Sequence, residues 1–119
     1  MQLRLLGLLA VGAIAGFAAD VSGTWHGKQT PSGSAERTFV FKQDGTKITG
    51  ETSSKMLGTS AIEDGTIEDD TISFTINAKF MGQGVKLFFK GKVSGNELKI
   101  NMRNDNGKLN VDFAAKKTS

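Results

Sequence analysis

Apolar and polar residues alternate along most of the chain after residue 20. Between residues 71 and 80, for example, Ile72, Phe74 and Ile76 alternate with threonine, serine and asparagine. A period of two is typical of a β-strand that buries one face and exposes the other. No stretch beyond residue 20 repeats its apolar residues with the 3.6-residue period of a helix. The pattern therefore predicts an all-β fold.

Eight such runs follow one another, separated by short segments rich in glycine, asparagine and aspartate. The predicted strands cover residues 21–29, 35–43, 47–53, 59–68, 71–80, 84–94, 97–104 and 108–116. Because short turns join consecutive strands, the strands form an antiparallel meander. A meander of this size buries its apolar face, and loses its exposed edges, by closing on itself. We therefore predict an eight-stranded antiparallel up-and-down β-barrel, with a two-sheet sandwich as the alternative.

The predicted turns can be tested, because loop length determines which residues face each other in a hairpin. Two-residue loops are expected at 44–45, 69–70, 82–83, 95–96 and 106–107. They pair Phe41 with Ile48, Ile67 with Ile72, Phe80 with Val85, Val93 with Leu98, and Met102 with Val111. Ile62 and Ile67 have an odd separation, which would place them on opposite faces. A β-bulge at Asp64-Gly65, with the glycine in the left-handed conformation, restores the common face.

The first 18 residues have a different character. Arg4 precedes an apolar run over residues 5–15, and small residues follow at Gly16 and Ala18. This is the layout of a secretory signal peptide, with cleavage expected after Ala18 and Ala19 as the second choice. The alternative is a retained membrane anchor, but the run is shorter than the roughly 20 residues that span a bilayer. We expect residues 19–119 to form one secreted or periplasmic domain with no membrane span.

The composition restricts the chemistry. The chain has no cysteine and one histidine, which excludes a disulfide scaffold, a thiolate metal site and a cysteine nucleophile. His26 is predicted to face outward beside Ser22 and Thr24, on a convex surface without a cleft. Glu36 and Glu51 also occupy outward or loop positions. We therefore predict no catalytic residue, no enzyme activity and no cofactor.

The charged residues indicate neither a metal site nor a nucleic-acid partner. The acidic residues between 63 and 70 are Glu63, Asp64, Glu68, Asp69 and Asp70. Their spacing matches no calcium loop, so they are predicted to be turn residues and not metal ligands. The formal net charge is +3 and falls to +2 without Arg4. This is too small for a dedicated nucleic-acid-binding protein.

The first predicted strand contains Ser22-Gly23-Thr24-Trp25. A glycine two residues before a tryptophan on strand one resembles the opening of lipocalins and avidins, the calycin-type barrels. The resemblance extends to small secreted bacterial barrel modules with the same start. It implies a lipocalin-like fold and not an activity. The chain has no tyrosine, so it lacks the Thr-Asp-Tyr element of lipocalins, and the biotin-binding aromatic residues of avidins cannot be carried over. Bacterial protease-inhibitor barrels share the size and start but have a disulfide.

The inner face of the predicted barrel is apolar. The inward positions are Trp25, Phe39, Phe41, Ile48, Ile62, Ile67, Ile72, Phe74, Ile76, Phe80, Leu87, Phe89, Val93, Leu98, Ile100, Met102, Leu109, Val111 and Phe113. Only the Trp25 indole can form a hydrogen bond, so no deep site for a polar ligand is expected. Small barrels commonly pack shut, which favours a filled core over the alternative of a small apolar cavity.

One end of the barrel is the candidate mouth. Loops 44–45, 69–70 and 95–96 are tight, whereas loops 30–34, 53–60, 81–84 and 105–107 lie at the other end and carry apolar residues. Methionine makes adaptable apolar contacts. Our hypothesis is an exported, non-enzymatic binding protein for a small apolar ligand; in the alternative interpretation these residues only cap the core. The candidate contacts at the mouth and interior are Met56, Leu57, Phe80, Met81, Trp25, Phe89 and Met102.

The outer face offers a second hypothesis. Lys86, Lys90 and Lys92 share a face with Lys99 and Arg103, and Phe88 points outward among them. The candidate surface residues are Phe88, Lys90, Lys92, Lys99 and Arg103. A basic face with an aromatic residue suits an extracellular protein or an anionic glycan, as in an accessory or inhibitor module with a filled core. A solvated lysine face that discourages aggregation is the simpler interpretation.

Overall fold

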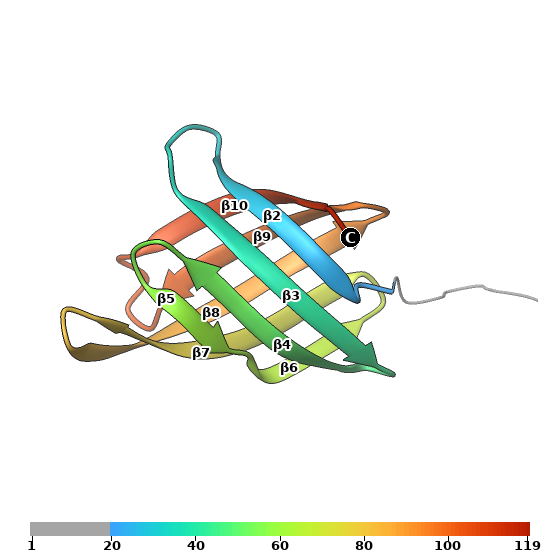
Figure 1. Ribbon diagram of the computed structural model, residues 1–119, viewed down its shortest axis with the longest axis horizontal. Helices are drawn as coiled ribbons and strands as arrows, with labels where there is room; N and C mark the ends of the chain where they lie inside the picture. The colour runs from blue at the N-terminus through green and yellow to red at the C-terminus, as the bar shows by residue number, and fades with distance from the viewer. Residues whose placement is uncertain (1–19) are drawn as a thin grey trace, which may run out of the picture.

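The computed structural model describes residues 20–119, and every regular element in that part of the chain is a β-strand (Figure 1). The strands are β2 (Gly23–Thr30), β3 (Glu36–Asp44), β4 (Lys47–Ser54), β5 (Gly58–Ala61), β6 (Glu63–Glu68), β7 (Thr71–Phe80), β8 (Gln83–Ser94), β9 (Glu97–Asn104) and β10 (Asn110–Lys117). The predicted all-β fold is confirmed. The predicted signal peptide and its cleavage site lie outside the described residues.

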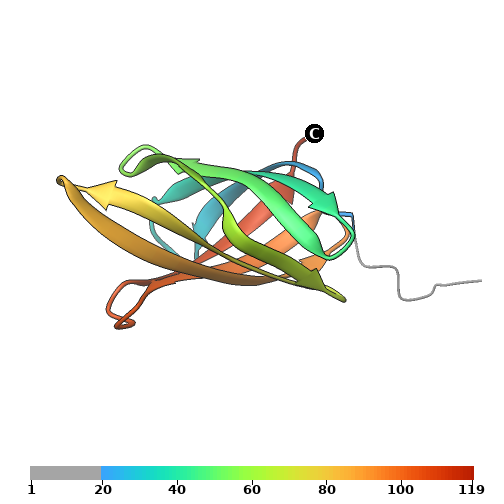
Figure 2. The ribbon, with the colours of Figure 1, turned by 90° about the horizontal axis from the view of Figure 1, so that it is seen from below.

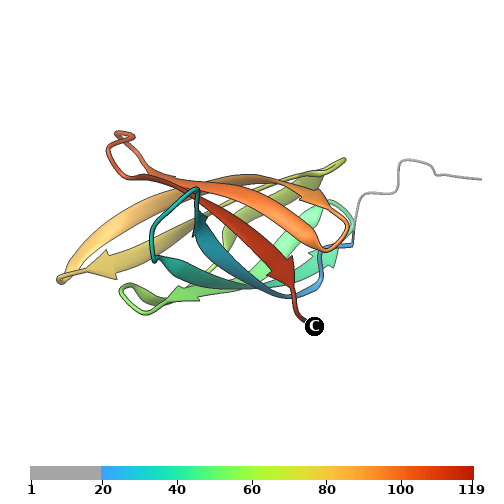
Figure 3. The same cartoon turned by 90° about the horizontal axis from the view of Figure 1, so that it is seen from above.

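The strands form one closed antiparallel barrel. Consecutive strands pair with each other, except that β5 and β6 do not, and β2 pairs with β10, which joins the first strand to the last. Figures 2 and 3 show strands on both sides of one interior. β5 and β6 both pair with β4 and together take one place in the ring, which therefore has eight strands. The up-and-down barrel is confirmed, and the sandwich alternative is wrong.

The predicted strand over residues 59–68 is interrupted by the predicted bulge. The pairing of β6 with β7 shifts between Glu63 and Thr66. The left-handed residue is Asp64, with φ of 53°, and not Gly65 as expected. Gly65 is needed for another reason: a Cβ at this position would lie 2.2 Å from the backbone oxygen of Ile48. The glycine allows β4 and β6 to approach where the sheet bends.

Three of the five predicted hairpin registers are confirmed and two are wrong by two residues. The pairs Ile67–Ile72, Val93–Leu98 and Met102–Val111 form as expected. In the other two hairpins Phe41 faces Gly50, and Ala78 faces Val85, because the loops are residues 45–46 and 81–82. Met81 and Gly82 both have positive φ, which is typical of a type I′ turn. A shift of two residues leaves every side chain on its predicted face.

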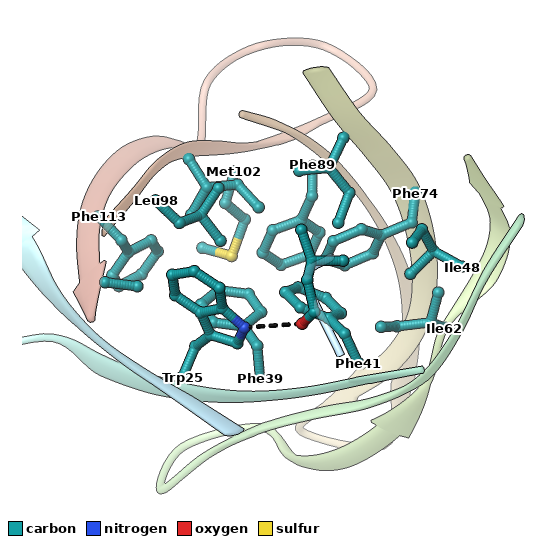
Figure 4. Close-up of a cluster of buried hydrophobic side chains, with 14 of the residues drawn as sticks. Trp25, Phe39, Phe41, Ile48, Ile62, Phe74, Phe89, Leu98, Met102 and Phe113 are labelled. Atoms are coloured by element: carbon teal, nitrogen blue, oxygen red, sulfur yellow. Dashed lines mark hydrogen bonds between the residues drawn. The ribbon is translucent and has the colours of Figure 1, made fainter. Parts of the chain in front are cut away.

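The core fills one end and the middle of the barrel. Trp25 is fully buried, and its indole Nε1–H donates to the backbone oxygen of Val21 at 2.9 Å. Val21 lies just before β2, and its backbone N–H donates to the Gln43 side chain near the β3–β4 turn. The rings of Phe39, Phe41, Phe74 and Phe89 meet in the middle (Figure 4). We call the end that Val21 covers the closed end.

Candidate ligand-binding site

The opposite end of the barrel, here called the open end, contains a cavity. Four connections gather there: β2–β3, β4–β5, β7–β8 and β9–β10 (Figure 1). The cavity has a volume of about 740 Å³. Small-molecule sites usually measure roughly 300–1,000 Å³, so this space is large enough for a ligand. The filled core expected from the sequence therefore holds for the closed end and the middle, and is wrong for the open end.

The cavity wall is divided by polarity. The apolar side chains come mainly from β7–β10 and the loop before β5: Met56, Leu57, Phe80, Val85, Met102, Leu109, Val111 and Phe113. The polar side chains come mainly from β2–β4 and the loops beside them: Gln29, Ser34, Glu36, Arg37, Ser54 and Lys55, with Asn104 from β9. A ligand in the cavity would therefore meet an apolar wall on one side and a polar wall on the other.

The predicted ligand contacts separate into two groups. Met56, Leu57, Phe80 and Met102 line the cavity. Phe80 and Leu109 were both predicted to face the core, yet they are 44% and 37% exposed because they stand where the wall opens to solvent.

The other three predicted contacts do not line the cavity. Met81 forms the tip of the β7–β8 turn and is 87% exposed. Trp25 and Phe89 are buried in the core. Trp25 lies toward the closed end, and Phe89 belongs to the aromatic cluster of the core (Figure 4).

Arg37 is the site residue that the sequence analysis missed. It is 3% exposed and lines the cavity, although the predicted interior contained no charge. The prediction was wrong because β3 was counted inward only from Phe39. Arg37 precedes Phe39 by two residues and so shares its face, opposite Gly27 on β2. Continuing the period of two by one more step would have found it.

The Arg37 guanidinium has few partners for a buried cation. Its Nη1–H donates to Thr52 Oγ1 at 3.3 Å, its Nη2–H donates to Ser54 Oγ at 3.4 Å, and Nε has no hydrogen-bond partner among the described residues. The ring of Phe89 lies 5.4 Å from the guanidinium carbon. Burial lowers the pKa of Arg37 to about 10, which still leaves it charged at neutral pH.

Thr52 and Ser54 hold the guanidinium from β4. Thr52 is buried, and its hydroxyl also donates to the backbone oxygen of Thr38 at 2.8 Å, so its lone pairs face Arg37. The Ser54 hydroxyl accepts a hydrogen bond from the backbone N–H of Leu57 at 3.1 Å, which ties the β4–β5 loop to the same cluster. The arginine is therefore positioned by groups that cannot neutralise it.

The outer basic face has the predicted arrangement. Phe88 faces Arg103 across the β8–β9 pair, and the guanidinium carbon lies 5.0 Å from the ring centre. Lys86 Nζ lies 5.6 Å from the same ring. Lys92 stands directly opposite Lys99. A shallow hollow of about 370 Å³ lies beside Phe88, Lys90, Asn101 and Arg103, among other residues.

The remaining candidate chemistry is sparse. His26 is exposed on β2, and its Nδ1 lies 3.1 Å from Thr38 Oγ1. Within residues 20–119, no group of three or more histidine, cysteine, aspartate or glutamate side chains could hold a metal ion. The same part of the chain contains no helix long and apolar enough to cross a membrane.

Comparison with known proteins adds no relative: no family model matches the chain, and no curated protein or solved structure is significantly similar to it. The closed barrel is compatible with a calycin-like fold. A fold of this kind does not determine a function, which resides in the residues of the site.

Proposed function

We propose that this protein is an exported, calycin-like, non-enzymatic binding protein that holds a small, mainly apolar ligand at the open end of its barrel. The observation that carries the proposal is the cavity of about 740 Å³ beside a core that is otherwise packed. The layout of residues 1–18 supports export, to a periplasm or outside the cell.

The composition of the cavity wall supports a ligand and not a defect of packing. Apolar side chains that line a space open to solvent forgo the free energy of burial and the contacts of a packed core. Here Val85, Leu109 and Val111 leave the space open where larger side chains would fill it. Phe80 remains exposed beside it. A bound apolar group would cover these side chains and recover the lost contacts.

The test uses N-phenyl-1-naphthylamine, an uncharged dye whose emission rises in apolar surroundings. We expect saturable binding with one dye per chain. Val85→Trp fills part of the cavity and should weaken binding at least tenfold. Val40→Trp is the matched control, because Val40 is exposed on the outer side of β3. Absence of saturable binding by the folded protein, or equal affinity in both variants, would reject the proposal.

The second candidate function uses the outer face around Phe88. Two cations stack on this ring, and the opposed lysines at 92 and 99 concentrate positive charge without a neutralising partner on the pair. An anionic glycan or an acidic protein surface would relieve that repulsion. Binding of an anionic polysaccharide, lost in Phe88→Ala with Lys90→Glu and kept in Val85→Trp, would favour this function over the cavity.

A further inference from the structure

The burial of the Arg37 guanidinium costs free energy of folding. A buried cation gives up its hydration and regains it only through charged partners or several good hydrogen bonds. Both hydrogen-bond partners of its guanidinium among the described residues are uncharged hydroxyls, and burial lowers its pKa. The two hydrogen bonds to Thr52 and Ser54 are long, at 3.3 and 3.4 Å. An apolar side chain of similar length would fill the same space without this cost.

The unused donors of Arg37 point to one kind of partner. A guanidinium has five N–H groups in a fixed plane, and the two hydroxyls on β4 engage one on Nη1 and one on Nη2. Nε–H remains unpaired together with a second N–H on each terminal nitrogen. Nε is covered by protein, whereas the two terminal nitrogens together form an edge of the fork whose N–H groups match the two oxygens of a carboxylate or phosphate.

The rest of the cavity fits such a ligand. Arg37 lines the cavity on the polar side, and Met102, Val111 and Phe113 line it on the apolar side. Two other charged residues, Glu36 and Lys55, also line the cavity, and both are exposed. Glu36 opposes an anion and Lys55 favours one, so these exposed charges largely offset each other. The buried positive charge of Arg37 therefore decides the sign of the ligand.

We infer that the ligand is an anionic amphiphile. Its carboxylate or phosphate head pairs with Arg37, and its apolar part lies against the apolar wall that β7, β8, β9 and β10 form. This inference rests on the proposed function, because it concerns the same cavity. It adds the charge and polarity of the ligand, which an apolar cavity alone does not determine.

The experiment compares ligands that share one tail. Dodecanoate, dodecyl phosphate and dodecanol are titrated below their aggregation concentrations, by displacement of the uncharged dye and by calorimetry. A charge-assisted hydrogen-bond pair in a buried site is worth about 10- to 100-fold in affinity. We therefore expect the anions to bind at least tenfold more tightly than dodecanol, and the ratio of the two anions identifies the preferred head.

The decisive variant is Arg37→Met, which keeps an unbranched apolar stem as far as the position of Nε and removes the charged end of the guanidinium. It should reduce anion affinity to that of dodecanol and leave dodecanol affinity within about threefold, since only the head contact is lost. Lys55→Met is the matched control, because it removes a charge from the exposed part of the wall and should change anion affinity by less than about threefold. Arg37→Lys keeps the charge without the fork and should give an intermediate loss.

The outcomes separate the two proposals. Equal binding of dodecanol and the anions, or a preference for anions that persists in Arg37→Met, would overturn the anionic ligand and leave the apolar site intact. Failure of all three amphiphiles and of the dye to bind the folded protein would overturn the proposed function itself. If Arg37→Met does not fold, Arg37→Lys supplies the comparison, and an unchanged anion preference there would reject bidentate pairing.

Discussion

The guanidinium of Arg37 lies over the ring of Phe89, with 5.4 Å between its central carbon and the ring centre. Phe89 itself stacks on Phe74, with ring centres 4.7 Å apart. The cation therefore rests on the aromatic cluster that fills the middle of the barrel next to the cavity. A cation above an aromatic face is attracted by the ring quadrupole, which offsets part of the lost hydration. The remaining cost is open to measurement.

Arg37→Met should stabilise the ligand-free protein. Replacing buried charged groups with apolar residues of similar size is often neutral or stabilising by about 1–4 kcal/mol. Among residues 20–119 the partners of this cation are hydroxyls and not acidic groups, so we expect a gain of about 1–3 kcal/mol in the free energy of unfolding. Urea unfolding followed by circular dichroism measures it. A loss of more than about 1 kcal/mol would mean that Arg37 is a structural element of the barrel and not a ligand contact.

The difference in the free energy of unfolding between the unmodified protein and Arg37→Met should depend on pH. Burial lowers the pKa of Arg37 to about 10, well below its ordinary value, so the folded state releases the proton more readily than the unfolded state. The charge therefore destabilises the fold fully below pH 10, and this penalty decreases as pH rises above 10 toward the higher pKa of the unfolded state. The advantage of Arg37→Met should shrink between pH 9 and pH 11. All other titratable groups are common to both proteins and cancel in the comparison.

Trp25 should report on the closed end alone. It is the single tryptophan of the chain, and it bonds to Val21 away from the cavity. We expect ligand binding at the open end to leave the wavelength of its emission unchanged. Trp25→Phe loses the bond to Val21 and some core volume, which should cost about 1–3 kcal/mol of stability and change ligand affinity by less than about threefold. A larger loss of affinity would place the ligand deeper in the barrel.

Gly65 should tolerate no side chain. A Cβ there would lie 2.2 Å from the backbone oxygen of Ile48, so Gly65→Ala must push β4 and β6 apart, at a cost of about 2–4 kcal/mol. Gly84 on β8 is the control, because it has no heavy atom within 4 Å of the added Cβ and no positive φ. Gly84→Ala should be neutral or slightly stabilising. Thermal unfolding of the two variants makes the comparison, and equal melting temperatures would contradict it.

The alternation of apolar residues was enough to predict the strands, the closed barrel and the end that carries the longer loops. It assigned faces correctly even where hairpins were misaligned, as at Phe41, because the misalignment was an even number of residues. The same rule predicts that Arg37 points inward. The cavity, unlike the strands and their faces, could not be predicted from this alternation. Whether Val85 and Val111 meet across the barrel depends on its cross-section and on how strand ends splay, and neither appears in a pattern with a period of two.

The opposed lysines on β8 and β9 should be a weak point of the outer face. Lys92 and Lys99 face each other directly, and like charges in that position destabilise a sheet. Lys99→Glu should therefore raise the free energy of unfolding by about 0.2–1 kcal/mol at low salt, with the gain decreasing as salt screens the pair. Lys42→Glu makes the same change of charge opposite Thr49, where no lysine is relieved, and should give no such gain. Denaturation of both variants at two salt concentrations decides the matter. If the two variants respond alike, the effect comes from net charge. In that case the two lysines are solvated independently, and the repulsion between their charges is weaker than their positions on the sheet indicate.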